Sequence, residues 1–129
     1  TTFINMFQVS LKEKLKKREL TFMGWVSYYH PSIIETILHT NIDGLFIDLE
    51  HTPISLNESQ HIIQLSQSYG VECMPRPISN DNNNYKKLLE LGANGILFPM
   101  IEDTQMVDNY QQVFYYPLQA KHLLTQHLF

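Results

Sequence analysis

The sequence has little cysteine, no long apolar run and no secretion signal. Cys73 is the single cysteine among 129 residues, so no internal disulfide can form. No uninterrupted apolar stretch approaches the roughly 20 residues that a membrane-spanning helix needs. The first residues also lack the basic segment, apolar core and small-residue cleavage site of a signal peptide. From these absences we expect a cytoplasmic protein that does not cross a membrane.

Positive charge is scarce as well. The net charge is −4 and the pI is near 5.8, which gives no general attraction for nucleic acid. One basic run at residues 12–18 departs from this, but leucines recur within it at helical spacing and glutamates dilute its charge. We interpret the run as the solvated face of a helix, with an anion or partner contact as the alternative, and we expect neither a nucleic-acid nor a membrane partner.

What the sequence does contain is a regular alternation of β-rich and helical segments. Strands are expected at residues 20–26, 43–48, 71–76 and 94–100, with centres separated by 23, 27 and 24 residues. Helices are expected from the Ser10 cap to about Glu19, from Pro31 onward, from the Asn57 cap to Gly70, from the loop 79–84 to Gly92, and from Asp103 or Thr104 to about Tyr115.

This spacing leaves room for a crossover helix after each strand of a parallel sheet. The strands are apolar without strict alternation, as in sheets that are covered on both faces. The sequence therefore predicts an α/β fold of about four βα units, in an open doubly wound sheet or a closed barrel. The first strand-to-helix turn, residues 27–31, has no glycine-rich phosphate loop, which disfavours the dinucleotide-binding open sheet.

Ionisable residues follow the predicted strands at their carboxyl ends, where parallel α/β folds place their working groups. His51 is the expected general base, because imidazole titrates near neutral pH and Asp48 could hold one ring nitrogen. A loop histidine in solvent is the alternative. Glu50 and Glu102 are interpreted as hydrogen-bonding groups, groups near a metal, or solvated acids.

Arg76 lies between two prolines at the end of the third strand. Its guanidinium suits bidentate binding of a carboxylate or phosphate, and the alternative is a structural ion pair with Asp48 or Glu50. Trp25 could line a pocket, although core packing is the expected role, and Cys73 is expected to be a buried filler and not a nucleophile.

Three segments resemble the HpcH/HpaI aldolase family, the class II pyruvate-type aldolases that include 2,4-dihydroxyhept-2-ene-1,7-dioate aldolase. They are IDLEHTP at 47–53, MPRP at 74–77 and GANGILFPMIED at 92–103. The resemblance implies a (β/α)8 TIM barrel and a carbon–carbon lyase that acts on 2-oxo and hydroxy acids through a pyruvate enolate. It also implies a divalent metal such as Mg²⁺, Mn²⁺ or Co²⁺, small 2-oxo acid and aldehyde substrates, and a homo-oligomer for full-length members.

Carried over by position, the resemblance makes His51 the catalytic base and Asp48 the acid that pairs with it. Arg76 matches the substrate-binding arginine, and Glu50 matches an acid close to the metal that does not ligate it. The metal ligands of the family lie on later strands, for which this sequence has no counterpart.

The resemblance covers residues 1–117, the N-terminal half of such a barrel, and residues 118–129 form a divergent tail. We therefore expect a truncated barrel with the acid–base half of a lyase site and little or no activity of its own. The alternative is a non-catalytic half-barrel remnant that binds small carboxylates or associates with itself, so whether the chain is an enzyme stays open at this point.

Overall fold

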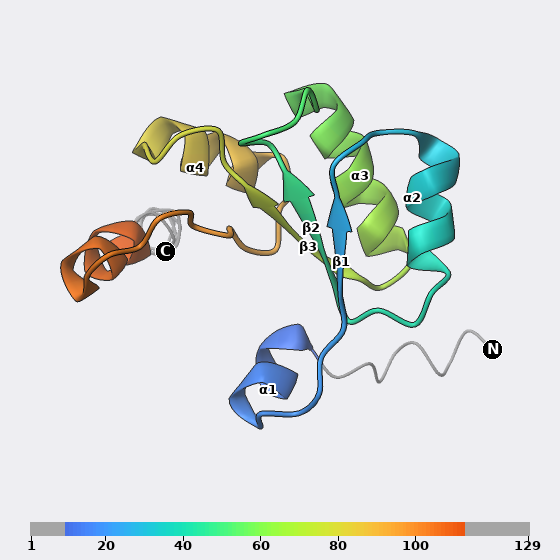
Figure 1. Ribbon diagram of the computed structural model, residues 1–129, viewed down its shortest axis with the longest axis horizontal. Coiled ribbons are helices and arrows are strands. Elements are labelled where there is room, and N and C mark those ends of the chain that lie inside the picture. The colour runs from blue at the N-terminus through green and yellow to red at the C-terminus, as the bar shows by residue number, and fades with distance from the viewer. Residues whose placement is uncertain (1–9, 113–129) are drawn as a thin grey trace, which may run out of the picture.

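The structure, a computed structural model, describes residues 10–112 and contains one parallel sheet (Figure 1). Its strands are β1 (Met23–Val26), β2 (Gly44–Asp48) and β3 (Glu72–Arg76), in the order β1-β2-β3. Each strand begins one to three residues later than predicted and ends at the predicted residue. The parallel α/β organisation expected from the sequence is confirmed.

Helices connect the strands. They are α1 (Leu11–Lys16), α2 (Pro31–Leu38), α3 (Leu56–Ser68) and α4 (Asn82–Glu90), and residues 104–112 are also helical. No helix in the described part of the chain is long and apolar enough to span a bilayer. The predicted extension of the last helix to Tyr115 and the predicted tail, residues 118–129, lie outside the described residues.

The core lies between one face of the sheet and helices α2, α3 and α4. Leu45, Ile47 and Cys73 point from the strands into it and have no solvent exposure. They pack against apolar side chains of the three helices, namely Ile34, Leu38, Ile62, Ile63 and Leu88. Figure 1 shows α2 and α3 side by side against this face.

The opposite face carries Trp25, Phe46 and Met74, which are register neighbours across the three strands. Trp25 is 45% exposed and its ring meets Phe46 edge-on, with centroids 5.7 Å apart. The expectation that Trp25 packs in the core is therefore wrong. Alternation along β1 turns Trp25 away from the buried Val26, and no helix among residues 10–112 buries it.

The predicted fourth strand is also wrong, since residues 94–100 form no strand. Two backbone hydrogen bonds join this segment to β3: Asn94 N–H donates to Cys73 O and Leu97 N–H to Pro75 O, each at 3.0 Å. The reverse bonds do not form. The Cys73 N–H donates instead to the Asn94 side chain at 2.9 Å, and Pro75 has no N–H to donate.

Serine side chains cap helices α1 and α3, and the cap of α3 differs from the predicted one. Ser10 caps α1 as predicted, although α1 ends at Lys16 and not near Glu19. The cap of α3 is Ser55 and not Asn57: its side chain accepts the Glu58 N–H while the Glu58 carboxylate accepts the Ser55 N–H. This reciprocal pair satisfies two backbone donors, which Asn57 inside the helix cannot do.

The basic run lies mostly in solvent, as its first interpretation expected. Lys12, Lys16, Lys17 and Arg18 are exposed, whereas Lys14 forms an ion pair with Asp43. The Leu11 N–H also donates to Glu72 Oε1 at 3.1 Å. Helix α1 is therefore fastened against the amino-terminal end of the sheet.

Candidate functional site

The parallel register places Asp48 and Arg76 side by side, because they are the last residues of β2 and β3 and are paired across the sheet. Arg76 Nε donates to Asp48 Oδ1 at 3.1 Å and Nη2 donates to Asp48 Oδ2 at 2.9 Å. This bidentate geometry is the strongest that a guanidinium and a carboxylate make. The hydrogen bond to Asp48 also raises the pKa of Arg76.

Two further groups hold the same guanidinium. Arg76 Nε lies 3.2 Å from Glu50 Oε2, and Arg76 Cζ lies 5.0 Å from the centroid of the Trp25 ring. The alternative interpretation of Arg76 was a structural ion pair with Asp48 or Glu50, and Arg76 forms an ion pair with both acids. The contact with Trp25 was not predicted from the sequence, because Trp25 is on β1 and Arg76 is on β3, and the two side chains meet across β2 on one face of the sheet.

Asp48 also organises the turn that follows β2. Its Oδ1 accepts the backbone N–H groups of Glu50 at 3.1 Å and His51 at 3.3 Å. Burial alone would raise the pKa of Asp48, but the hydrogen bonds from Arg76 and from these N–H groups outweigh it and lower the pKa. Asp48 is therefore an ionised anchor for both the arginine and the turn.

His51 does not make the expected contact between its ring and Asp48. Asp48 binds the backbone of His51, and the ring instead places Nε2 at 3.6 Å from Glu50 Oε1. Arg76, Asp48, Glu50, Trp25 and His51 together form what we call the Arg76 cluster. The His51 side chain is 69% exposed, so it lies at the solvent side of this cluster. The physical reason is that both Asp48 oxygens are already occupied by Arg76 and by backbone donors.

The remaining candidates lie apart from this cluster. Glu102 is exposed and is not among the residues that hold Arg76, which are Asp48, Glu50 and Trp25. Cys73 is fully buried on the helix side of β3, and burial raises the pKa of its thiol to about 12. The expectation that Cys73 is a buried filler is confirmed.

The described residues do not form a metal site. Among residues 10–112, no three His, Cys, Asp or Glu side chains lie together as a metal ion would require. Asp48 and Glu50 are acids within the cluster, but the Arg76 guanidinium occupies the side on which they converge. A cation placed there would have to displace a fixed positive charge.

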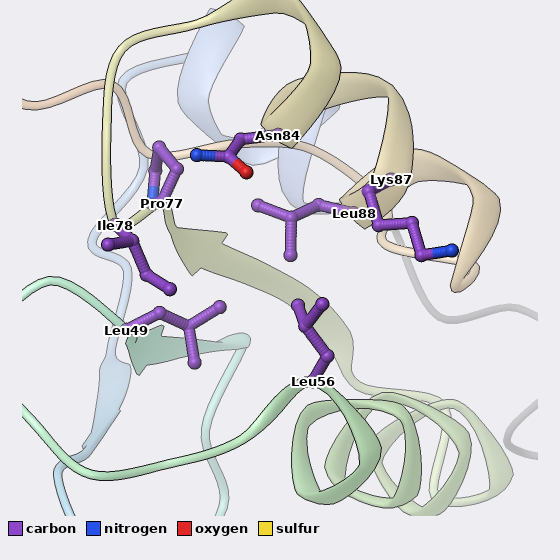
Figure 2. Close-up of a pocket in the computed structure, with 7 residues that line it drawn as sticks. All are labelled: Leu49, Leu56, Pro77, Ile78, Asn84, Lys87 and Leu88. Carbon is purple, nitrogen blue, oxygen red and sulfur yellow. The ribbon is translucent and has the colours of Figure 1, made fainter.

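A small apolar pocket adjoins the cluster on the helix side of the strand ends (Figure 2). Leu49, which follows Asp48, points into it together with Leu56 and Leu88. Leu49 is 3% exposed and its N–H donates to Arg76 O at 3.0 Å. The turn that carries Glu50 and His51 is thereby fastened both to the core and to β3.

Comparison with known proteins identifies the family. Residues 21–124 match the model of the HpcH/HpaI aldolase/citrate lyase family. The chain belongs to this family. The matched range includes every residue of the Arg76 cluster.

Two relatives of known name, both aldolases, are similar to this chain. The chain is 29% identical over 91 residues to 2-dehydro-3,6-dideoxy-6-sulfogluconate aldolase of Pseudomonas putida, a match that covers 70% of this chain and 36% of the relative. It is 27% identical over 106 residues to 2-keto-3-deoxy-L-rhamnonate aldolase of Shigella boydii, covering 82% of this chain and 40% of the relative. The chain thus spans about two fifths of the length of these relatives or less.

A solved HpcH/HpaI aldolase from Desulfitobacterium hafniense superposes with a TM-score of 0.68 at 22% identity. The match covers 76% of this chain and 38% of that chain. This likeness confirms the expected fold class, a part of an HpcH/HpaI-type (β/α)8 barrel.

Proposed function

We propose that this chain supplies the substrate-binding and proton-transferring strands of a carbon–carbon lyase that acts on 2-oxo acids. The observation that carries the proposal is the fixed guanidinium of Arg76 at the carboxyl ends of the strands. Family membership supports lyase chemistry, and both aldolase relatives are named for 2-keto or 2-dehydro sugar acids.

In this proposal Arg76 binds the substrate carboxylate. Its Nε and Nη2 point at Asp48, and Nη1 has no partner among the described residues. A guanidinium has five N–H donors, so the end formed by Nη1 and the second proton of Nη2 can hold a carboxylate in bidentate fashion. Asp48 and Trp25 fix the plane of the guanidinium beforehand, which reduces the entropy cost of binding.

His51 is proposed as the base. In the cleavage direction it takes the proton of the hydroxyl on the carbon that becomes the aldehyde. The carbon–carbon bond then breaks, and its electron pair passes into the enolate of the 2-oxo acid. The exposed ring is free to meet such a hydroxyl, and Glu50 is the neighbouring carboxylate that can stabilise it when it is protonated.

The enolate also needs a positive charge at its oxygen, which a divalent metal supplies in enzymes of this chemistry. Residues 10–112 offer no cluster of three metal-binding side chains. We therefore propose that the 129-residue chain alone is nearly inactive.

Binding of oxamate, a pyruvate analogue, tests the role of Arg76. We expect weak binding by calorimetry, and we expect Arg76→Lys to weaken it by about tenfold, because lysine keeps the charge but loses the bidentate geometry. Arg18→Lys is the matched control, since Arg18 is exposed and remote from the cluster in sequence. Unchanged binding by Arg76→Lys would contradict the proposed role.

Turnover tests the rest of the proposal. The chain is assayed with pyruvate, an aldehyde and Mg²⁺ or Mn²⁺, and His51→Ala is compared with His61→Ala, another exposed histidine. Little turnover is expected from either. Robust turnover abolished by His51→Ala alone would overturn the expected inactivity while supporting the role of the base.

A non-catalytic carboxylate-binding role is the second candidate. It is favoured by the ion pairs that Arg76 forms with Asp48 and Glu50, because a carboxylate paired with a guanidinium is less available to bind a metal ion. Oxamate binding that is independent of added Mg²⁺ or Mn²⁺ favours this role, whereas metal-dependent binding favours the lyase.

A further inference from the structure

We propose that a hollow between the loops that follow β1 and β2 binds a small organic ammonium ion. The hollow has a volume of about 200 Å³ and is lined by five residues, namely Tyr28, Tyr29, Pro53, Ile54 and Glu58. Both loops lie at the carboxyl end of the sheet, beside the first turn of α3 (Figure 1). The proposal does not use the Arg76 cluster, so it goes beyond the proposed function and does not depend on it.

Two tyrosines form aromatic walls of this hollow. Tyr28 is 64% exposed, so its ring is accessible to a ligand from solvent. Tyr29 is half-buried and packs against the core, and its hydroxyl lies 3.3 Å from His61 Nδ1 on α3. One aromatic wall is therefore fixed by the fold, and the other is open to the surface.

Glu58 supplies the single formal charge among the five lining residues. Its Oε2 accepts the Ser55 N–H at 2.7 Å in the capping box of α3, which holds the carboxylate in place. Its Oε1 has no partner among residues 10–112 and is free to face a cation. Because Glu58 is half-buried, its attraction for a cation is screened less than at the open surface.

This combination of aromatic rings and one carboxylate favours an organic cation. The faces of aromatic rings attract ammonium groups, and cages of aromatic side chains bind quaternary ammonium ligands in many proteins. An anion would be repelled by Glu58 and would find no basic side chain in the lining. The amino-terminal end of α3 carries about half a positive charge, which the full negative charge of Glu58 outweighs.

A metal ion is a poorer fit than an organic cation. The part of the chain that the structure describes has no group of three His, Cys, Asp or Glu side chains that could hold a metal. Sites for drug-sized molecules have volumes of roughly 300 to 1,000 Å³. The hollow is smaller, at about 200 Å³, and suits a trimethylammonium group with a short substituent.

Titration of the 129-residue chain with choline chloride, followed by NMR, tests the proposal. We expect the ring signals of Tyr28 and Tyr29 to shift and to saturate with a Kd of about 1 to 10 mM. Sodium chloride at the same ionic strength should leave these signals unshifted. Ethanolamine should bind more weakly than choline, because a primary ammonium group costs more to remove from water.

The uncharged analogue of choline, in which a carbon atom replaces the nitrogen, separates charge from shape. It should bind at least about tenfold more weakly than choline, because it loses the attraction of both the rings and Glu58. Equal binding of the analogue would show that the hollow is apolar without a preference for a cation, and would overturn the proposal.

Substitutions at Tyr28 test the aromatic contact. Tyr28→Ala should weaken choline binding by about fivefold, whereas Tyr28→Phe keeps an aromatic face and should bind like wild type. Phe22→Ala is the matched control, because Phe22 is also exposed but precedes β1, at the opposite end of the strand from Tyr28.

Glu58→Gln tests the charge and should weaken choline binding by about tenfold. Glutamine can still accept the Ser55 N–H, so the capping box and the fold should remain, which circular dichroism checks. Glu35→Gln, which neutralises an exposed glutamate on α2, is the matched control. Tyrosine signals that do not shift at choline concentrations well above the expected Kd would overturn the proposal. Choline binding that is unaffected by both Tyr28→Ala and Glu58→Gln would overturn it as well.

Discussion

Arg76 and Asp48 meet edge to edge at the ends of adjacent parallel strands, through two hydrogen bonds of 3.1 and 2.9 Å. Asp48 also accepts two backbone N–H groups of the turn that carries Glu50 and His51. One carboxylate therefore fixes both the arginine and the histidine turn. Removing the charge of Asp48 should therefore lower the stability of the fold, whatever its effect on catalysis.

Asp48→Asn should lower the free energy of unfolding by about 1.5 to 3 kcal/mol, because the variant loses charge-assisted hydrogen bonds at a buried position. Urea denaturation followed by circular dichroism measures this change. Glu102→Gln, which neutralises an exposed acid, is the control and should change stability little. Equal stability of Asp48→Asn and wild type would show that the pair contributes nothing net.

Acid should weaken the fold in a defined window. The pKa of Asp48 is lower in the folded chain than its ordinary value of 3.8, so the unfolded chain binds the proton first as the pH falls. The stabilisation is fully present above this ordinary value and is lost as the pH drops through the folded pKa. Urea midpoints measured from about pH 6 downward, a pH well above the range in which carboxyl groups titrate, should fall less steeply for Asp48→Asn than for wild type.

Asp43 limits how much of the acid effect Asp48→Asn removes. The hydrogen bond from Lys14 is the largest cause that lowers the pKa of Asp43, so this carboxylate acts in the same direction. Some acid sensitivity should therefore remain in Asp48→Asn. An acid profile identical to that of wild type would contradict the assignment to Asp48.

The Cys73 thiol should be inert in the folded chain, because it is fully buried and its pKa is raised to about 12. Its reaction with a disulfide reagent at mildly alkaline pH should follow the opening of the structure. In urea the reaction should be fast, which serves as the internal control. Rapid modification under native conditions would mean that β3 and its covering helices open readily.

Ser55→Ala should cost about 1 kcal/mol, since it removes the side chain that caps α3. Asn57→Ala is the matched control, because Asn57 lies inside the helix and is exposed. Thermal and urea unfolding compare the two variants. A larger loss for Asn57→Ala would reverse the cap assignment.

The sequence predicts the three strands well because each is an apolar run that ends in a charged or turn residue. It predicts the fourth strand wrongly because the apolar pattern of residues 94–100 does not reveal which hydrogen-bond donors the neighbouring strand offers. Pro75 is visible in the sequence, but its effect on an adjacent segment depends on which side of β3 its missing N–H faces. The exposure of Trp25 cannot be predicted either, because it depends on whether a helix covers this face, and none among residues 10–112 does.

The candidate site, too, can be predicted only in part from the sequence. Placing Asp48, Glu50, His51 and Arg76 at strand ends follows from the parallel pattern alone. Their pairing does not, because Asp48 can meet either the His51 ring or Arg76, and only the register decides between them. Register places Arg76 directly opposite Asp48, and the ring of His51 is left to Glu50.

The prolines of β3 have a consequence for aggregation. A sheet grows when a strand from another molecule finds both donors and acceptors along an edge. Beside β3 the Cys73 N–H is already bound by the Asn94 side chain, and Pro75 offers only its carbonyl, which Leu97 occupies. The groups of β3 on this side are therefore not available to a strand from another molecule, and β1 is the edge of the described sheet at which misassembly should begin, beside the exposed Trp25.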